Sequence, residues 1–186
     1  YVELFNPTTS AMNVYANPPL VGNDPYALYY YNHSDSGSQF PVSVVNSTYV
    51  PAGGFYLCAR RSPVNVKGRS YTPDCVYGSE LIQEDRAGGV VLYRNGGSGL
   101  TKIDAVAWSK SGGSPENAPN TAIESTAVTS DGFQEGEQLA RMIAPGSTSY
   151  PFGPAYDTDD NATNFFGPTS PIALSAHTIS NSSSVI

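Results

Sequence analysis

The sequence predicts an all-β domain with long loops. Only 13% of the 186 residues are charged, and the chain contains 18 glycines, 15 prolines and 13 tyrosines. This abundance of turn formers and aromatic residues is typical of β-proteins. No window of the sequence sustains the 3.6-residue apolar period of a long amphipathic helix. The length fits a single domain with a core of its own.

Six short strands are expected in the first 60 residues. Residues 1–5 alternate in polarity, and this strand ends at Asn6 because the following proline cannot donate to a β-ladder. A turn over residues 51–54 precedes the last of the six. The other expected strands are residues 12–15, 27–31, 40–45, 48–50 and 55–58.

Residues 89–108 carry the strongest local signal, that of a β-hairpin. Two β-prone runs flank a glycine-rich link that begins with Asn-Gly, and such residues tolerate the positive φ angles of a tight turn. Val90 and Leu92 share one face of the first strand, and Ile103 is expected to anchor the second. Because Trp108, the only tryptophan, closes the hairpin, we expect the centre of the core here.

The net charge of −7 argues against two classes of partner. Nucleic acids and anionic membranes are bound through a basic face, so we expect neither. No run of about 18 apolar residues is present, so we expect no membrane insertion. Because the chain begins at Tyr1 without a methionine, we expect a mature or trimmed form. The lack of a signal peptide in such a form says little about export.

Cysteines and glycosylation sequons favour an extracellular or cell-surface protein. Two lone cysteines in a cytosolic protein would usually be free thiols. The sequons and the low charge favour export instead, so we expect a disulfide between Cys58 and Cys75. The candidate glycosylation sites are Asn32, Asn46, Asn161 and Asn181.

The order of motifs along the chain resembles the lamin tail domain family. The motifs are VELFNPT at residues 2–8, VPAGGFYLCA at 50–59, the hairpin of 89–108, GEQLARM at 136–142 and DTDDNATNFFGPTSP at 157–171. The resemblance implies an immunoglobulin-like β-sandwich over residues 1–171, followed by a C-terminal extension over residues 172–186. The chain departs from the family by an insert at residues 60–74 and by this extension. It has neither rod-forming heptads nor a basic nuclear-targeting run, so it resembles the exported microbial members.

The insert carries four of the nine basic residues: Arg60, Arg61, Lys67 and Arg69. A solvated loop held by the disulfide is the simpler interpretation, and a docking surface for an acidic partner is the alternative. Acidic residues gather elsewhere, which would suit a head-to-tail contact between copies of the chain. These acidic residues are Asp131, Glu135, Glu137, Asp157, Asp159 and Asp160.

The extension over residues 172–186 alternates apolar with small or polar side chains. Its candidate contact residues are Ile172, Leu174 and Ile179. The segment is expected either as a last strand of the same sandwich, as a strand donated to the edge of a neighbouring copy, or as a linker.

Asp157, Asp159 and Asn161 form the one ligand-like group in the sequence. Oxygen donors at relative positions 1, 3 and 5 of a tight loop suit a hard cation such as Ca²⁺. The glycine at position 6 and the glutamate at position 12 of an EF-hand are replaced by Ala162 and Pro168. The alternative is an Asx-type turn, in which carboxylates accept hydrogen bonds from backbone N–H groups.

The sequence contains no recognisable catalytic motif, and we do not expect an enzyme. His33 and His177 lie in unrelated polar contexts, and nucleophilic catalysis requires a base within reach of a serine or cysteine. The tyrosines at residues 29–31 could stack on sugar rings or form an interface, although alternate members of such a run are core residues in a sandwich.

The sequence therefore predicts a non-catalytic extracellular structural or interaction domain. We expect it to form a homo-oligomer or filament, as a self-assembling subunit of a surface layer, through β-strand addition in which Ile172 and Leu174 fill pockets of a neighbouring copy. The alternative is a module that binds carbohydrate or another surface ligand, with or without Ca²⁺.

Overall fold

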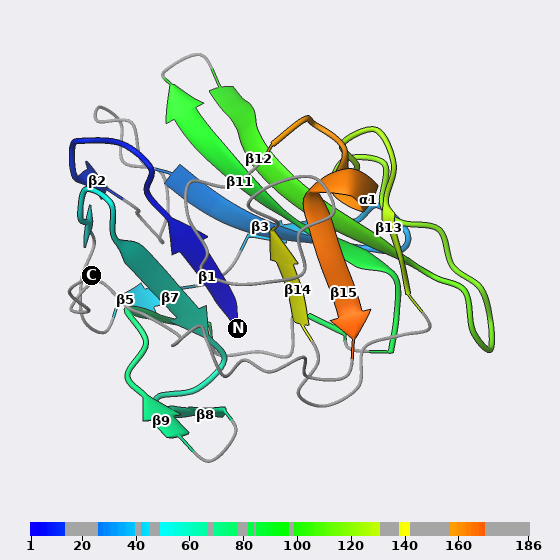
Figure 1. The fold of residues 1–186 in the computed structure, drawn as a ribbon, viewed down its shortest axis with the longest axis horizontal. Helices are drawn as coiled ribbons and strands as arrows, with labels where there is room; N and C mark the ends of the chain where they lie inside the picture. The colour runs from blue at the N-terminus through cyan, green and yellow to red at the C-terminus, as the bar shows by residue number, and fades with distance from the viewer. Residues whose placement is uncertain are drawn as a thin grey trace.

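The computed structural model describes residues 1–13, 26–39, 42–44, 49–66, 69–77, 82–83, 85–96, 99–130, 138–141 and 157–169. These residues form two main β-sheets and three short two-stranded ribbons (Figure 1). The one helix among them, α1 (Asn161–Asn164), has four residues. The prediction of an all-β chain is thus confirmed. Within the described part, no helix is long and apolar enough to cross a membrane.

The larger sheet has five strands in the order β13-β12-β11-β3-β4. All neighbouring strands are antiparallel except β12 and β13, which run parallel. The predicted hairpin forms its centre, since β11 and β12 pair along almost their whole length. The strands are β3 (Tyr26–Asn32), β4 (Gly37–Gln39), β11 (Gly88–Gly96), β12 (Gly99–Lys110) and β13 (Val128–Ser130).

The smaller sheet has four strands in the order β1-β7-β10-β5. Strands β7 and β10 run parallel, and Cys58 lies directly opposite Cys75 in their register, with 4.6 Å between the Cα atoms. The predicted Cys58–Cys75 disulfide is therefore confirmed, and it joins neighbouring strands of one sheet. The strands are β1 (Val2–Phe5), β5 (Val42–Val44), β7 (Phe55–Ala59) and β10 (Cys75–Tyr77).

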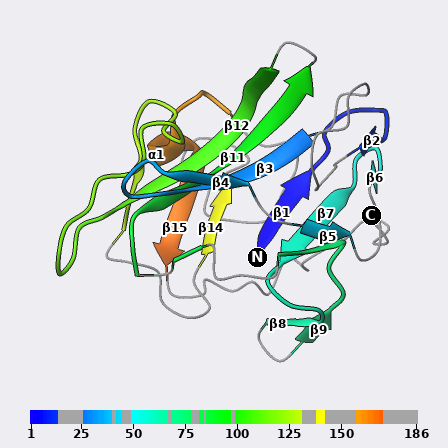
Figure 2. The ribbon, with the colours of Figure 1, turned by 180° about the vertical axis from the view of Figure 1, so that it is seen from behind.

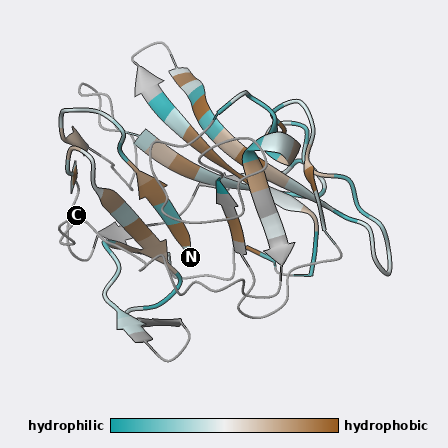
Figure 3. Ribbon diagram, in the orientation of Figure 1, coloured by the Kyte–Doolittle hydropathy of each residue, from teal (hydrophilic) through white to brown (hydrophobic). Residues whose placement is uncertain are grey.

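The two sheets face each other across the main hydrophobic core. The face that points into this core carries the even-numbered residues of β3 and β11, and of β12 from Val106 to Trp108, because successive side chains of a strand alternate between its faces. The hydrophobic segments of β1 and β7 are coloured brown in Figure 3. The buried residues of this core are Leu28, Tyr30, Val50, Tyr56, Cys58, Cys75, Tyr77, Val90, Trp108 and Val128.

The opposite face of the five-stranded sheet is covered by the segment that joins β12 to β13, residues 111–127. Small side chains let this segment approach closely: a Cβ placed on Gly89 would lie 2.4 Å from the Cβ of Ala122. A larger residue at this position would push the segment off the sheet. The second buried cluster comprises Val91, Tyr93, Ala105, Ala107, Ala118 and Ala122.

One expectation for the hairpin is wrong. Trp108 is buried as predicted, but Ile103 is 46% exposed. A β-bulge between Leu92 and Tyr93 is the reason: Leu92 pairs with Asp104 and Tyr93 pairs with Lys102, so Ile103 has no residue opposite it in β11. A bulge of this kind re-aims the side chain of the extra residue.

Three ribbons complete the described structure. The expected loop over residues 60–74 contains a small antiparallel ribbon of β8 and β9, which projects away from both sheets in the front and back views (Figures 1 and 2). The ribbon strands are β2 (Met12–Asn13) with β6 (Tyr49–Val50), β8 (Val64–Val66) with β9 (Arg69–Tyr71), and β14 (Gln138–Arg141) with β15 (Phe165–Thr169).

Candidate functional site

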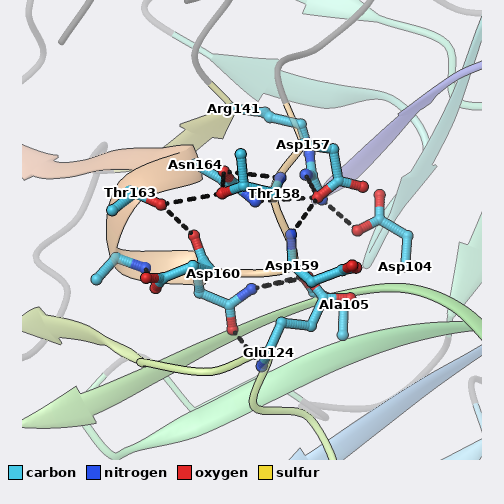
Figure 4. Close-up of polar contacts among 12 residues, drawn as sticks. Asp104, Ala105, Glu124, Arg141, Asp157, Thr158, Asp159, Asp160, Thr163 and Asn164 are labelled. Atoms are coloured by element: carbon cyan, nitrogen blue, oxygen red, sulfur yellow. Dashed lines mark hydrogen bonds and ion pairs between the residues drawn. The ribbon is translucent and has the colours of Figure 1, made fainter. Parts of the chain in front are cut away.

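The acidic motif at residues 157–163 forms a turn followed by the short helix α1 (Figure 4). Asp160 is the N-cap of this helix, and its carboxylate accepts a hydrogen bond from the Ala162 N–H at 3.1 Å. The Asp159 N–H donates to Asp157 Oδ1 at 3.1 Å, which is an Asx-type turn. Asn164 also binds this carboxylate, since its Nδ2 donates to Asp157 Oδ1 at 3.0 Å.

The Asn161 carboxamide is fully buried against strand β12. Its Nδ2 donates to the Ala105 carbonyl at 2.9 Å, and its Oδ1 accepts from the Ala107 N–H at 3.0 Å. Strand β13 pairs with this side of β12 only from Trp108 onward. The amide group of Asn161 therefore takes the place of a partner strand where β13 has not yet begun.

A similar arrangement is found in the first motif of the chain. Asn6 is buried, and its Nδ2 donates to the carbonyls of Val50 and Pro51 at 3.1 and 3.0 Å. Its Oδ1 accepts from the Thr8 N–H at 3.0 Å. In both motifs a buried asparagine side chain forms hydrogen bonds with backbone groups that have no partner within the secondary structure.

Glu124 is the buried partner of Asn161. Its carboxylate accepts from Asn161 Nδ2 at 3.1 Å, and its backbone carbonyl accepts from the Asn161 N–H at 3.0 Å. Burial, together with the negative charges of Asp104 and Asp157, raises the pKa of the Glu124 carboxyl to about 7. The buried Glu124 carboxyl is therefore partly protonated near neutral pH.

Among the described residues, Arg141 on β14 forms the ion pairs with Asp104 and Asp157. Its Nη1 lies 2.9 Å from Asp157 Oδ1, and its Nη2 forms an ion pair with Asp104. The guanidinium also lies over the ring of Phe165 at 4.5 Å from the centroid, a cation–π contact. Burial raises the pKa of Asp104, and the charge of Arg141 opposes this shift.

The structure does not bring the three expected calcium ligands together. Asn161 Oδ1 is held in the core by Ala107 and Glu124, whereas Asp157 Oδ1 is bound by Asn164 and faces Arg141. Asp159 is exposed, in a left-handed conformation with φ of 53°. Among the described residues, no group of three His, Cys, Asp or Glu side chains is arranged to hold a metal ion.

The candidate glycosylation sites have different outcomes. The prediction of a glycan at Asn161 is wrong for the folded chain. The atom that would carry the glycan, Nδ2, is buried and donates two hydrogen bonds, which leaves no room for a sugar. Asn32 is half-buried at the end of β3, and its Oδ1 accepts from the N–H groups of Ser34 and Ser36. Asn46 and Asn181 lie outside the described residues.

The tyrosine run on β3 divides between the two faces of the sheet. Tyr30 is in the main core, as expected for one member. Tyr29 and Tyr31 are half-buried on the other face, where the Tyr31 hydroxyl lies 3.0 Å from that of Tyr93. Tyr29 packs edge-on against Tyr93, with 5.2 Å between the ring centroids. The three rings thus contact one another.

A small apolar cavity of about 40 Å³ lies beside the edge strand β1. All four residues of β1 are half-buried, and among the described strands β1 pairs only with β7. The expected contact residues Ile172, Leu174 and Ile179 lie outside the described residues. The cavity is lined by Leu4, Phe5, Asn6, Met12, Tyr26, Val50 and Leu92.

Sequence reasoning did not identify Glu124, Arg141 or Asp104 as partners of the acidic motif. Glu124 is 37 residues from Asn161, and Asp104 is 37 residues from Arg141. The only sequence signal was the scarcity of charge, because few basic residues are available to pair with the carboxylates of Asp104, Glu124 and Asp157. Compared with protein-family models, curated proteins and solved structures, the chain matches none.

Proposed function

We propose that the chain is a non-catalytic, extracellular interaction domain that assembles with copies of itself by β-strand addition. In this proposal, residues 172–186 of one copy pair with β1 of the next copy, on the side of β1 that faces away from β7. One apolar side chain of that segment, Ile172, Leu174 or Ile179, enters the cavity beside β1. The observation that carries the proposal is this apolar cavity next to an edge strand.

The general energetics of sheet edges support this assignment. The unpaired backbone groups of an edge strand favour pairing with another chain unless they are covered. A donated strand would supply main-chain hydrogen bonds, and a side chain in the cavity would supply specificity. Each apolar carbon group buried in this way contributes roughly 0.8 kcal/mol. Because the donor and the acceptor surfaces differ, the contact is heterologous and leads to filaments or rings.

An immunoglobulin-like sandwich related to the lamin tail domain is part of the same proposal. Two facing sheets around one core and the placement of the two asparagine-containing motifs support it. The disulfide inside one sheet is a difference from antibody domains, whose disulfide joins the two sheets. The disulfide also supports an oxidising, extracellular location.

Sedimentation velocity on the full chain tests the proposal. We expect the unsubstituted chain to sediment as species larger than the monomer, and Leu174→Asp to sediment as a monomer because a carboxylate cannot enter an apolar cavity. Ser183→Asp adds the same charge to the same segment and is expected to assemble normally. Identical sedimentation of Leu174→Asp and Ser183→Asp would contradict the proposal.

Hydrogen exchange gives a second, local readout. In the assembled chain the amides of β1 should be protected more strongly than in Leu174→Asp, whereas the amides in the centre of β11 should exchange equally in both. Equal protection of β1 in the two proteins would assign the assembly to another surface.

A further inference from the structure

A polar cleft lies at one end of the five-stranded sheet, whereas β1 belongs to the four-stranded sheet. It opens between the turn that follows β3 and the segment that joins β12 to β13. Its volume is about 590 Å³, and small-molecule sites measure roughly 300–1,000 Å³. The lining residues that matter here are His33, Ser34, Asp35, Asn117, Asn120 and Thr126.

A hydrogen bond links the two walls of the cleft. The Thr121 N–H donates to Asp35 Oδ1 at 3.0 Å, which ties one wall to the other across 86 residues of sequence. Asp35 has a φ of 58°, a left-handed conformation that is uncommon for a residue other than glycine. Such backbone strain persists only where the surroundings enforce it, and it is frequent at ligand sites.

An ion pair supports the histidine at the edge of the cleft. Arg86 Nη2 lies 3.0 Å from His33 Nε2, and Arg86 Nε donates to Glu116 Oε1 at 2.5 Å. The second oxygen of Glu116 accepts from the Ala87 N–H at 2.9 Å. These contacts order the His33 ring before any ligand arrives, which lowers the entropy lost on binding.

The cleft combines a polar rim with an apolar floor. Within the described residues, the carboxamides of Asn117 and Asn120 and the hydroxyls of Ser34 and Thr126 make no hydrogen bond to the protein. Each carboxamide is both donor and acceptor, and each hydroxyl likewise. The floor is formed by Ala118, Pro119, Ile123 and Ala127.

The charges around the cleft select against ions. The lining contains the Asp35 carboxylate but no lysine or arginine, so an anionic ligand would be repelled. A metal ion would find a single carboxylate there, too few oxygen ligands of that kind for a hard cation. A neutral ligand that offers both donors and acceptors fits the rim, and its C–H surface fits the floor.

We propose that this cleft binds a neutral polyhydroxylated ligand, namely a sugar unit of an uncharged oligosaccharide. Neighbouring hydroxyls of the sugar bind the carboxamides of Asn117 and Asn120 and the free oxygen of Asp35, while its C–H face lies on Pro119 and Ile123. The site shares no residue with the cavity beside β1, so it is independent of the proposed assembly.

The test is an NMR titration of the full chain with four probes, the neutral trisaccharides chitotriose, cellotriose, xylotriose and mannotriose. We expect at least one of them to shift the amide resonances of residues 117–123. Asn117→Ala and Asn120→Ala should each weaken this binding about fivefold, the effect of one lost hydrogen bond of about 1 kcal/mol. Thr101→Ala, an exposed change on β12 outside the cleft, should leave the affinity unchanged.

Three results would overturn the proposal. The first is the absence of shifts in the cleft at about 10 mM of every probe, a concentration that detects even weak sugar binding. The second is binding that both asparagine variants retain in full, with thermal melting curves that show all variants folded. The third is tighter binding of the anionic trisaccharide of galacturonic acid than of every neutral probe.

Discussion

Asn161 and Glu124 bind each other through both side chain and backbone. Asn161 Nδ2 donates to Glu124 Oε2 at 3.1 Å, and the Glu124 N–H donates to Asn161 Oδ1 at 3.3 Å. The same carboxamide binds two alanines of β12. The most ligand-like motif of the sequence is therefore used to close the edge of a sheet, and this gives it a role in stability.

Replacement of Asn161 by alanine should destabilise the fold strongly. The change leaves the Ala105 carbonyl and the Ala107 N–H buried without partners, and each such group costs about 1–3 kcal/mol. We expect a loss of roughly 3 kcal/mol in the free energy of unfolding, measured in urea. Asn120→Ala, the same change at an exposed position, should cost less than about 0.5 kcal/mol. Equal losses in the two variants would show that the carboxamide of Asn161 is dispensable.

Glu124 should make stability depend on pH. Its pKa is raised to about 7 in the fold, so the native state binds its proton more tightly than the unfolded chain. The contribution of this group therefore stabilises the fold most below pH 4.5 and declines as the pH rises toward 7. After allowance for solvent screening, the decline is on the order of 1–2 kcal/mol.

The measurement is the difference in unfolding free energy between the unsubstituted chain and Glu124→Gln at several pH values. Glutamine keeps the oxygen that accepts from Asn161 but does not titrate, so the variant should gain stability relative to the parent as the pH rises from 4.5 to 7. A difference that stays constant with pH would contradict the raised pKa.

Calcium should not stabilise the fold through the acidic motif. The oxygen of Asn161 is committed to backbone N–H groups in the core, and Asp157 faces the guanidinium of Arg141. We expect the melting temperature to be the same in millimolar Ca²⁺ and in a chelator. A clear rise with Ca²⁺ that is lost in Asp159→Asn would restore the calcium site that the spacing predicted.

The disulfide should contribute roughly 3 kcal/mol, because it closes a loop of 17 residues in the unfolded chain. Urea unfolding of the oxidised chain, and of the chain denatured with a reductant present, measures this difference. The chain has no other cysteine, so the reductant has a single target. Superimposable unfolding curves would show that the cross-link adds no stability.

Features with a local cause were predictable from the sequence. The Asn-Gly link and the alternation of Val90 and Leu92 indicated the central hairpin, because turn chemistry and strand period depend on neighbouring residues. The disulfide was predictable because only one pair of cysteines exists. The burial of Tyr30 between two half-buried tyrosines follows from the same period of two.

Features that depend on distant contacts were not predictable. Ile103 was expected in the core, but a bulge moves it to the surface, and nothing in the residues around it marks that position. For the motif of Asn161 the sequence left a cation site, a glycan and an Asx-type turn as alternatives, and its partners on β12 and at Glu124 come from segments more than 30 residues away. The cleft likewise needs two loops that only the folded sheet brings together.

The mass of the full chain in solution tests the proposed assembly most directly. Static light scattering over a range of protein concentrations should give masses that rise well above the monomer mass of 19.7 kDa, because donated strands link one copy to the next. A mass that stays at 19.7 kDa at every concentration would contradict the account, since a chain whose β1 is paired with the strand of another copy cannot be a monomer.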